Sequence, residues 1–165
     1  MKCSRCKWVL FVVAVALTTV GNTSPLNGMP LASDLQNEAA QAQAACIPVL
    51  LEFAVDSCEY CVLLEEEVLR PMLRNRAYDQ RVLVRKVALD GAARLRDFDG
   101  QSVSAAGLAE RYRVTVTPTL IFVGNRGEEL AERMVGVTTL EFYGGYLDQA
   151  LDAARDRLRE QTDCR

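Results

Sequence analysis

Two cysteines three residues apart, Cys58 and Cys61, are the residues of this sequence best placed to do chemistry. They stand at the join between an apolar run, Val49 to Val55, and a stretch with helical periodicity that starts at Cys61. The first turn of a helix has unpaired N–H groups and a partial positive charge, and both stabilise a thiolate. The pair is therefore typical of a small disulfide ring, or of attacking and resolving thiols in thiol–disulfide exchange.

The position of each thiol indicates its role. We expect Cys58 to be the more exposed thiol and the nucleophile, and Cys61, one turn in, to face the core and resolve the mixed disulfide. A structural disulfide, half of a zinc site and copper(I) binding stay open as alternatives. Zinc needs four Cys or His ligands, and the chain contains no histidine. The sequence thus predicts neither a metal site nor a cofactor.

One carboxylate, Glu52, interrupts the apolar run from Val49 to Val55. Such a run is typical of a central strand covered on both faces, where a carboxylate is costly unless it is partnered or protonated. Glu52 lies six residues before Cys58, so the strand could bring it beneath the dithiol. With its pKa raised by desolvation, Glu52 would take the proton from Cys61 during the resolving step. The alternative is an edge carboxylate that reaches water.

A helix is expected after the dithiol. Its apolar positions follow a 3.6-residue period: Cys61, Leu64, Val68, Leu69, Met72 and Leu73. The acidic run Glu65 to Glu67 is expected largely on the solvated side, and Pro71 predicts a kink or an end near Arg70.

Val82 to Leu89 predicts a second strand, and the order strand, helix, strand implies a parallel crossover. Both strands then end at the sheet edge that holds the dithiol. The polar stretch from Gly91 to Val103 leaves this edge as a loop. It is either a wall beside the active site that includes Phe98, or a surface decoration.

The remaining elements flank this unit. Ser33 is a candidate cap for a short helix from Asp34 to Ala45. After the loop, the pattern predicts a helix over Ser104 to Tyr112, a strand through Val123, a turn at Gly124 to Gly127, a strand over Leu130 to Val135, and a long helix with the apolar face Leu140, Tyr143, Leu147, Leu151, Ala154 and Leu158.

In this order the pieces resemble the thioredoxin superfamily from about Cys46 to Arg159, and most closely the exported bacterial thioredoxin-like proteins of the SoxW kind. The resemblance rests on the strand with its acid and dithiol, and on three further motifs: Val87-Ala88-Leu89-Asp90, Tyr112 to Thr119 with Thr117-Pro118, and Gly136. It implies the α/β thioredoxin fold: a central mixed β-sheet flanked by helices, here with an N-terminal helix and an insertion after the second strand.

The resemblance also implies a cis peptide at Pro118 that lies against the dithiol and offers the Thr117 backbone to an extended substrate; the alternative is a trans proline in a plain turn. Glu59 and Tyr60 replace the family's usual Gly-Pro between the cysteines, and Ser57 replaces its usual Trp. The predicted substrate-binding residues are therefore Thr117, Pro118, Glu59 and Tyr60, but the substrate itself cannot be inherited from thioredoxin.

The N-terminus predicts export. Lys2, Arg5 and Lys7 precede an uncharged apolar segment, Trp8 to Val20, which is short for a bilayer span and typical of a secretory signal. We expect a signal peptide over residues 1–21 and a periplasmic location, with an uncleaved membrane anchor as the alternative.

The length of 165 residues suggests one domain after the signal: a linker and helix over 22–45, a thioredoxin-like domain over 46–159 and a tail over 160–165. The formal charge of −3, without a basic stretch, predicts no nucleic-acid partner. Disulfide-containing proteins or small thiols are the expected substrates.

Glu59 places a negative charge beside the future thiolate of Cys58, which disfavours the thiolate and favours a reductase over an oxidase. The resemblance suggests a membrane thiol carrier of the DsbD or CcdA kind as the electron donor. Cys46 and Cys164 are expected near the opposite sheet edge. They either pair as a structural disulfide or stay apart because Cys164 lies in a flexible tail.

Overall fold

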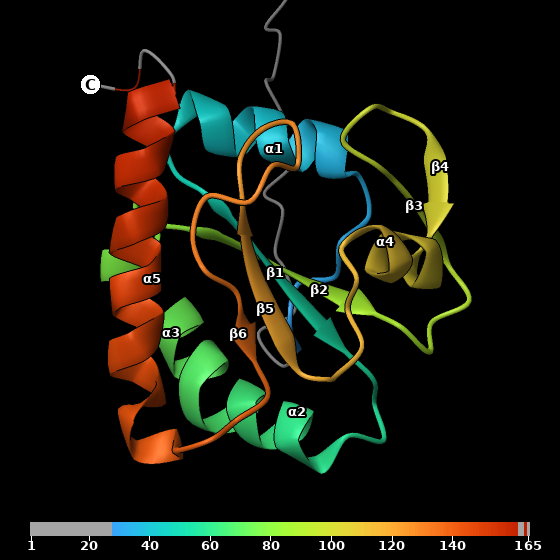
Figure 1. Cartoon of the computed structure of the whole chain (residues 1–165), viewed down its shortest axis with the longest axis vertical. Helices are drawn as coiled ribbons and strands as arrows, with labels where there is room; N and C mark the ends of the chain where they lie inside the picture. The colour runs from blue at the N-terminus through green and yellow to red at the C-terminus, as the bar shows by residue number, and fades with distance from the viewer. Residues whose placement is uncertain (1–27, 162–163, 165) are drawn as a thin grey trace, which may run out of the picture.

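The computed structural model describes residues 28–161 and residue 164. Its centre is a four-stranded sheet in the order β2-β1-β5-β6 (Figure 1). The strands are β1 (Val49–Ala54), β2 (Leu83–Ala88), β5 (Thr119–Val123) and β6 (Met134–Val135). β2 runs parallel to β1, whereas β5 is antiparallel to β1 and β6 is antiparallel to β5. The predicted mixed sheet and its parallel pair are confirmed.

Helices cover both faces of the sheet (Figure 1). One face carries α2 (Glu59–Leu64), a π-helical turn (Glu65–Leu69), α3 (Arg70–Arg74) and α5 (Leu140–Gln161). The other face carries α1 (Leu35–Ala44) and α4 (Ala105–Arg111). A single 3-10 turn, Arg76–Tyr78, follows α3.

β1 is buried along its whole length and divides the core into two layers. Because side chains alternate along a strand, Leu50 packs in the layer beneath α2, α3 and α5, and Leu51 packs in the layer beneath α1 and α4. Glu52 shares the face of Leu50. The alternation therefore sends this carboxylate towards the helix that carries the dithiol.

The last helix shows the predicted apolar stripe. Its buried residues recur at helical spacing: Tyr143, Leu147, Leu151, Ala154 and Leu158. They close the layer that contains Leu50, and they bring the C-terminal end of α5 back towards the start of β1 (Figure 1).

The predicted insertion after β2 is a two-stranded hairpin, β3 (Arg94–Arg96) and β4 (Ser102–Ser104). It lies beside α1 and α4, away from α2 (Figure 1). Phe98 at its tip lies close to Gly127, in the turn that follows β5 at the Val49 end of β1. The interpretation of this segment as a wall beside the dithiol is therefore wrong.

Three local boundaries differ from the sequence-based expectation. Asp34 caps α1 in place of Ser33, because its carboxylate accepts the N–H of Asn37 at 3.0 Å. The helix after the dithiol begins at Glu59, two residues earlier than expected.

The expected strand over residues 130–135 is also shorter than predicted. Leu130 donates its N–H to the Phe122 carbonyl oxygen at 2.8 Å, but regular pairing resumes only at Met134. Between them the chain leaves the ladder, and Arg133 donates to the Tyr112 carbonyl oxygen at 2.6 Å.

Cys46 and Cys164 form a disulfide with a Cα–Cα distance of 5.4 Å. Cys164 is buried, and the bond joins the end of the chain to the segment that enters β1. The predicted signal peptide over residues 1–21 lies outside the described residues. Within residues 28–161 and 164, no helix has both the length and the apolar character needed to cross a membrane.

Candidate active site

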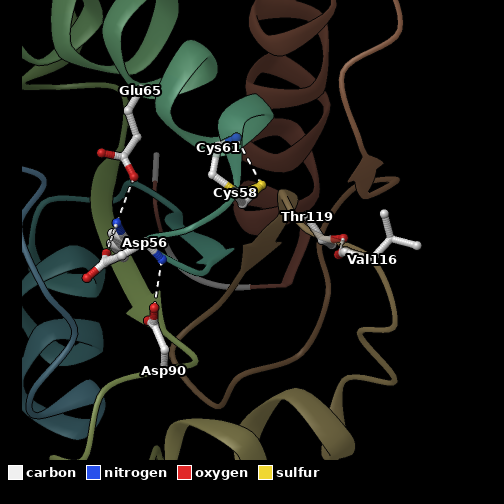
Figure 2. Close-up of a disulfide and its surroundings, with 8 residues drawn as sticks. Asp56, Cys58, Cys61, Glu65, Asp90, Val116 and Thr119 are labelled. Carbon is white, nitrogen blue, oxygen red and sulfur yellow. Dashed lines mark hydrogen bonds and ion pairs between the residues drawn. A yellow bond between two sulfur atoms is a disulfide. The ribbon is translucent and has the colours of Figure 1, made fainter.

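The dithiol is a disulfide between Cys58 and Cys61 at the start of α2 (Figure 2). Cys58 is the N-cap residue, and its Sγ accepts the N–H of Cys61 at 3.1 Å. Cys58 is half-buried, whereas Cys61 is fully buried. Of the two residues, Cys58 is therefore the one that a second thiol or disulfide can reach. A thiolate on Cys58 would receive the same N–H and the partial positive charge of the helix end.

The connection between β1 and α2 is tied to the end of β2. The N–H of Asp56 donates to the Asp90 carboxylate at 2.8 Å (Figure 2), and the N–H of Cys58 donates to the Val55 carbonyl oxygen at 3.2 Å. Asp90 belongs to the predicted end of the second strand. It therefore fixes the loop that presents the dithiol.

The Thr117–Pro118 peptide bond is cis. This loop enters β5 at Thr119, which pairs with Phe53 near the end of β1 that leads to the dithiol. The hydroxyl of Thr119 donates to the Val116 carbonyl oxygen at 2.7 Å (Figure 2), and the N–H of Gly136 donates to the Pro118 carbonyl oxygen at 2.8 Å. These two hydrogen bonds fix the loop that contains Pro118, which lies at the same end of the sheet as the dithiol.

The predicted substrate-binding residues differ in exposure. Glu59 and Tyr60 are exposed on the first turn of α2, and Tyr60 keeps 61% of its surface. Thr117 is half-buried and Pro118 is buried. Tyr60 therefore presents an exposed ring, whereas Pro118 presents little surface.

Glu52 lies in the core with 0% exposure, between Lys86 on β2 and Leu120 on β5 in the strand register. Neither of its carboxylate oxygens has a hydrogen-bond partner. Burial, with a further contribution from the negative charge of Glu65, raises the pKa of Glu52 to about 8, against the opposing charges of Lys86 and Arg70. A buried carboxylate with a raised pKa was predicted, and the edge position is excluded.

A second buried carboxylate, Glu65, was not foreseen. It is 5% exposed, and its Oε1 lies 2.8 Å from Nζ of Lys86, while Oε2 lies 3.5 Å from Arg70. The expectation that it faces solvent is wrong for Glu65 and right for Glu66 and Glu67. The signal was present in the spacing, because a residue four positions after Cys61 lies on the same helix face as Cys61.

Tyr143 on α5 closes the same layer. Its side chain is buried, and its hydroxyl has no hydrogen-bond partner. Burial and then the charge of Glu52 raise the pKa of Tyr143, so its phenol stays neutral around physiological pH. Sequence reasoning placed Tyr143 on the apolar face of α5 but did not connect it with Glu52.

The arrangement can carry out disulfide exchange. It offers a half-buried cysteine at a helix N-terminus, a buried second cysteine and, from the adjoining strand, a carboxyl whose pKa allows proton exchange near neutral pH. Among the residues that the structure describes, no group of three or more His, Cys, Asp or Glu side chains could hold a metal ion.

Residues 35–151 match a family of thioredoxin-like domains. Among solved structures, the chain is similar to the DsbH oxidoreductase, with a TM-score of 0.54, 18% identity, and coverage of 83% of this chain and 95% of DsbH. It is also similar to Trxlp of Edwardsiella tarda EIB202, with a TM-score of 0.47, 30% identity and coverage of 66% and 88%. A third similar structure is oxidised thioredoxin O2 of Arabidopsis thaliana, with a TM-score of 0.49, 18% identity and coverage of 71% and 91%.

No curated protein sequence matches the chain. The family match nevertheless covers most of the described residues, and the mixed sheet with a dithiol at the start of α2 agrees with it. The chain belongs to the thioredoxin-like family.

Proposed function

We propose that this protein is an exported thiol–disulfide oxidoreductase that reduces disulfides with Cys58 and Cys61. The observation that carries the proposal is the asymmetry of the pair: the half-buried Cys58 caps α2, and the buried Cys61 shares a layer with the carboxyl of Glu52. A disulfide kept only for stability needs neither a helix cap nor a buried acid.

In the proposed reaction, the Cys58 thiolate attacks one sulfur of the substrate disulfide. The substrate S–S bond breaks, one substrate thiolate leaves, and the other half stays bound to Cys58. The carboxylate of Glu52 then takes the proton of Cys61, and the Cys61 thiolate attacks Sγ of Cys58. The mixed disulfide breaks, the second substrate thiolate leaves, and both leaving thiolates take protons from water. The protein loses two electrons and the substrate gains two.

Reactivation reverses this sequence. A donor thiolate attacks Sγ of Cys58, Cys61 leaves as a thiolate, and it accepts the proton of Glu52. A second donor thiolate then attacks the donor sulfur bound to Cys58, the mixed disulfide breaks, and Cys58 leaves as a thiolate. The donor loses two electrons and the protein gains two. With a pKa of about 8, Glu52 is mostly protonated at neutral pH in the oxidised protein. The carboxyl is thus in the form that can donate its proton to the leaving sulfur.

The negative charge of Glu59 next to Cys58 favours the reductase direction, because it disfavours the reactive thiolate relative to a neutral neighbour. A reductase in an oxidising compartment needs a donor, and we propose a membrane thiol carrier of the DsbD or CcdA kind. Export is proposed from the signal-like N-terminus, with the periplasm as the location.

For the substrate, we propose a disulfide-containing protein or a small disulfide, as in the SoxW-like group. Thr117 would present its backbone to an extended segment, and the exposed ring of Tyr60 would contact the residues beside the disulfide. Pro118 and Glu59 border the same approach. The half-buried position of Cys58 suits a segment that lies along the surface.

Two cysteine variants test the mechanism. Cys58→Ser should abolish turnover in an insulin-reduction assay, because the attacking sulfur is lost. Cys61→Ser should accumulate mixed disulfides, visible as adducts that run at higher mass on non-reducing gels and disappear with dithiothreitol. Cys46→Ser serves as the control and should trap no substrate, since its bond lies at the other end of β1. Retained turnover in Cys58→Ser would refute the mechanism and favour a non-catalytic binding module with a structural disulfide.

A further inference from the structure

Glu52 and Lys86 should pair but do not. They are register partners on the adjacent parallel strands β1 and β2, and cross-strand neighbours of opposite charge normally attract. Nζ of Lys86 instead lies 2.8 Å from Glu65 and 3.3 Å from Asp56. Both oxygens of Glu52 stay without a partner in the core. The cation opposite the buried acid is engaged elsewhere.

The second nearby cation is also engaged. Arg70 lies 3.5 Å from Glu65 and 3.7 Å from Glu66. An unpaired ionised carboxylate in the core would be costly, whereas a neutral carboxyl is much less so. Lys86 and Arg70 therefore stabilise the negative charge on Glu65. That charge in turn favours the protonated form of Glu52.

We propose that Glu65 is a positioning residue: it holds Lys86 away from Glu52 and so keeps Glu52 protonated in the oxidised protein at neutral pH. The inference rests on the proposed function, in which Glu52 supplies its proton to Cys61. In this proposal the proton stays on Glu52 because of the ion pair between Glu65 and Lys86 as well as because of burial. The π-helical turn that carries Glu65 is then part of the redox site.

The groups that face Glu52 from each neighbouring element agree with this assignment. The helical layer contributes Glu65 and Arg70, β2 contributes Lys86, α5 contributes Tyr143, and β5 places the apolar Leu120 opposite Glu52. Asp56, in the loop before the dithiol, engages Lys86 from the solvent side. Lys86 is thus the only described cation that stands opposite Glu52 in the strand register, and Glu65 is its closest described ion-pair partner.

The test is a carboxyl titration of the oxidised protein. The Glu side chains are labelled with ¹³C at the carboxyl carbon, and the Glu52 signal, assigned by its loss in Glu52→Gln, is followed by NMR between pH 5 and pH 10. In Glu65→Gln, Lys86 loses its main partner and turns to Glu52. The pKa of Glu52 should then fall by about one unit or more. An unchanged or raised value would overturn the proposal.

Glu67→Gln is the matched control, because it removes the same charge from the same helical turn at an exposed position. Its Glu52 titration should match that of the unmodified protein. Glu65→Asp keeps the charge and should keep most of the raised pKa. If Glu65→Gln does not fold, Glu65→Asp and Lys86→Met still test the assignment: a large fall in Glu65→Asp, or a fall rather than a rise in Lys86→Met, contradicts it.

A double-variant cycle separates the two ways in which Glu65 can act. If Glu65 works through Lys86, the effect of Glu65→Gln should shrink when Lys86→Met is already present, because only direct repulsion between the two acids remains. Equal falls with and without Lys86 would overturn the positioning role.

A kinetic readout links this contact to chemistry. Dithiothreitol reduces Cys58–Cys61, and the measured rate is divided by the concentration of the dithiothreitol thiolate at each pH. This rate should decline above about pH 8 in the unmodified protein, because Glu52 then loses its proton. In Glu65→Gln the decline should begin at lower pH, and an unshifted profile contradicts the proposal. The NMR titration does not depend on turnover. A Cys58→Ser variant that still reduces insulin would therefore refute the function while leaving the Glu65 contact testable by itself.

Discussion

The two disulfides among the described residues lie at opposite ends of β1 and differ in their surroundings. Cys58–Cys61 closes a sequence separation of 3 and lies beside a layer that contains Glu52, Glu65 and Lys86. Cys46–Cys164 closes a separation of 118 and ties the end of the chain to the entrance of β1. Under the proposed function, the surroundings distinguish the two bonds: a helix cap and a buried carboxyl suit exchange, whereas a long closed loop suits stability.

Removing the distal bond should give the largest change in stability. The Cys46→Ala/Cys164→Ala variant is expected to lose about 3–5 kcal/mol of unfolding free energy, because its long loop restricts the unfolded chain most. Its insulin-reducing activity should stay close to that of the unmodified protein. Urea denaturation and the turnover assay measure the two quantities on one sample.

The matched variant, Cys58→Ala/Cys61→Ala, should show the opposite pattern. Its closed ring is short, so the loss of stability should be smaller, about 1–2 kcal/mol by the same chain-entropy relation. Its turnover should vanish. Equal losses of stability in the two double variants would break the contrast between the bonds.

Replacing the buried acid should change the stability with the opposite sign. The folded-state pKa of Glu52 is raised to about 8 from 4.5, so between these values the unfolded chain releases a proton that the folded protein keeps. The stability of the native protein should therefore decrease as pH rises from about 4.5 to 8. Glu52→Leu should remove this slope and gain on the order of a few kcal/mol at pH 8.

Denaturation curves at pH 5 and pH 8 measure that slope, and Glu66→Leu is a control on the exposed side of the same layer. The gain in stability should come with slower resolution by Cys61, which quench-flow trapping of the mixed disulfide detects. If the stability of Glu52→Leu depends on pH as steeply as that of the unmodified protein, then the burial of Glu52 does not destabilise the fold.

The smallest expected effect concerns the charge beside the nucleophile. Glu59→Gln removes an exposed negative charge next to Cys58, which should lower the pKa of the Cys58 thiol and raise the reduction potential of the pair by up to about 30 mV. Equilibration against glutathione buffers measures the potential. The distal bond should keep its own potential in this variant, and a parallel shift of both would point to a global change.

Sequence reasoning worked where a strong pattern and a chemical anomaly coincide. The apolar run of β1 is long enough to identify a buried strand, and a lone acid in it has few explanations. The same reasoning failed at Glu65, because a run of three glutamates is usually a solvated helix face and only the spacing from Cys61 distinguishes the first of them. Its ion pair with Lys86 joins elements far apart in the chain, and periodicity does not report such contacts.

The hairpin within the predicted insertion was missed for a different reason. Strands of three residues are too short to show an alternating pattern, so the sequence predicted a loop where β3 and β4 form a hairpin. Asp97 in this hairpin is fully buried and accepts a hydrogen bond from Arg111 on α4. The pairing of Cys46 with Cys164 stayed open because it depends on where α5 ends.

The distal disulfide turns residues 46–164 into a covalently closed circle that contains every strand of the central sheet together with Cys58 and Cys61. A protease that cuts once within this circle, for example in the hairpin insertion, releases no fragment, because the two pieces remain joined through sulfur. The nicked protein can keep its sheet, and the cut appears only on a reducing gel. This tolerance of a single cut lasts as long as reductants in the surroundings leave the Cys46–Cys164 bond intact.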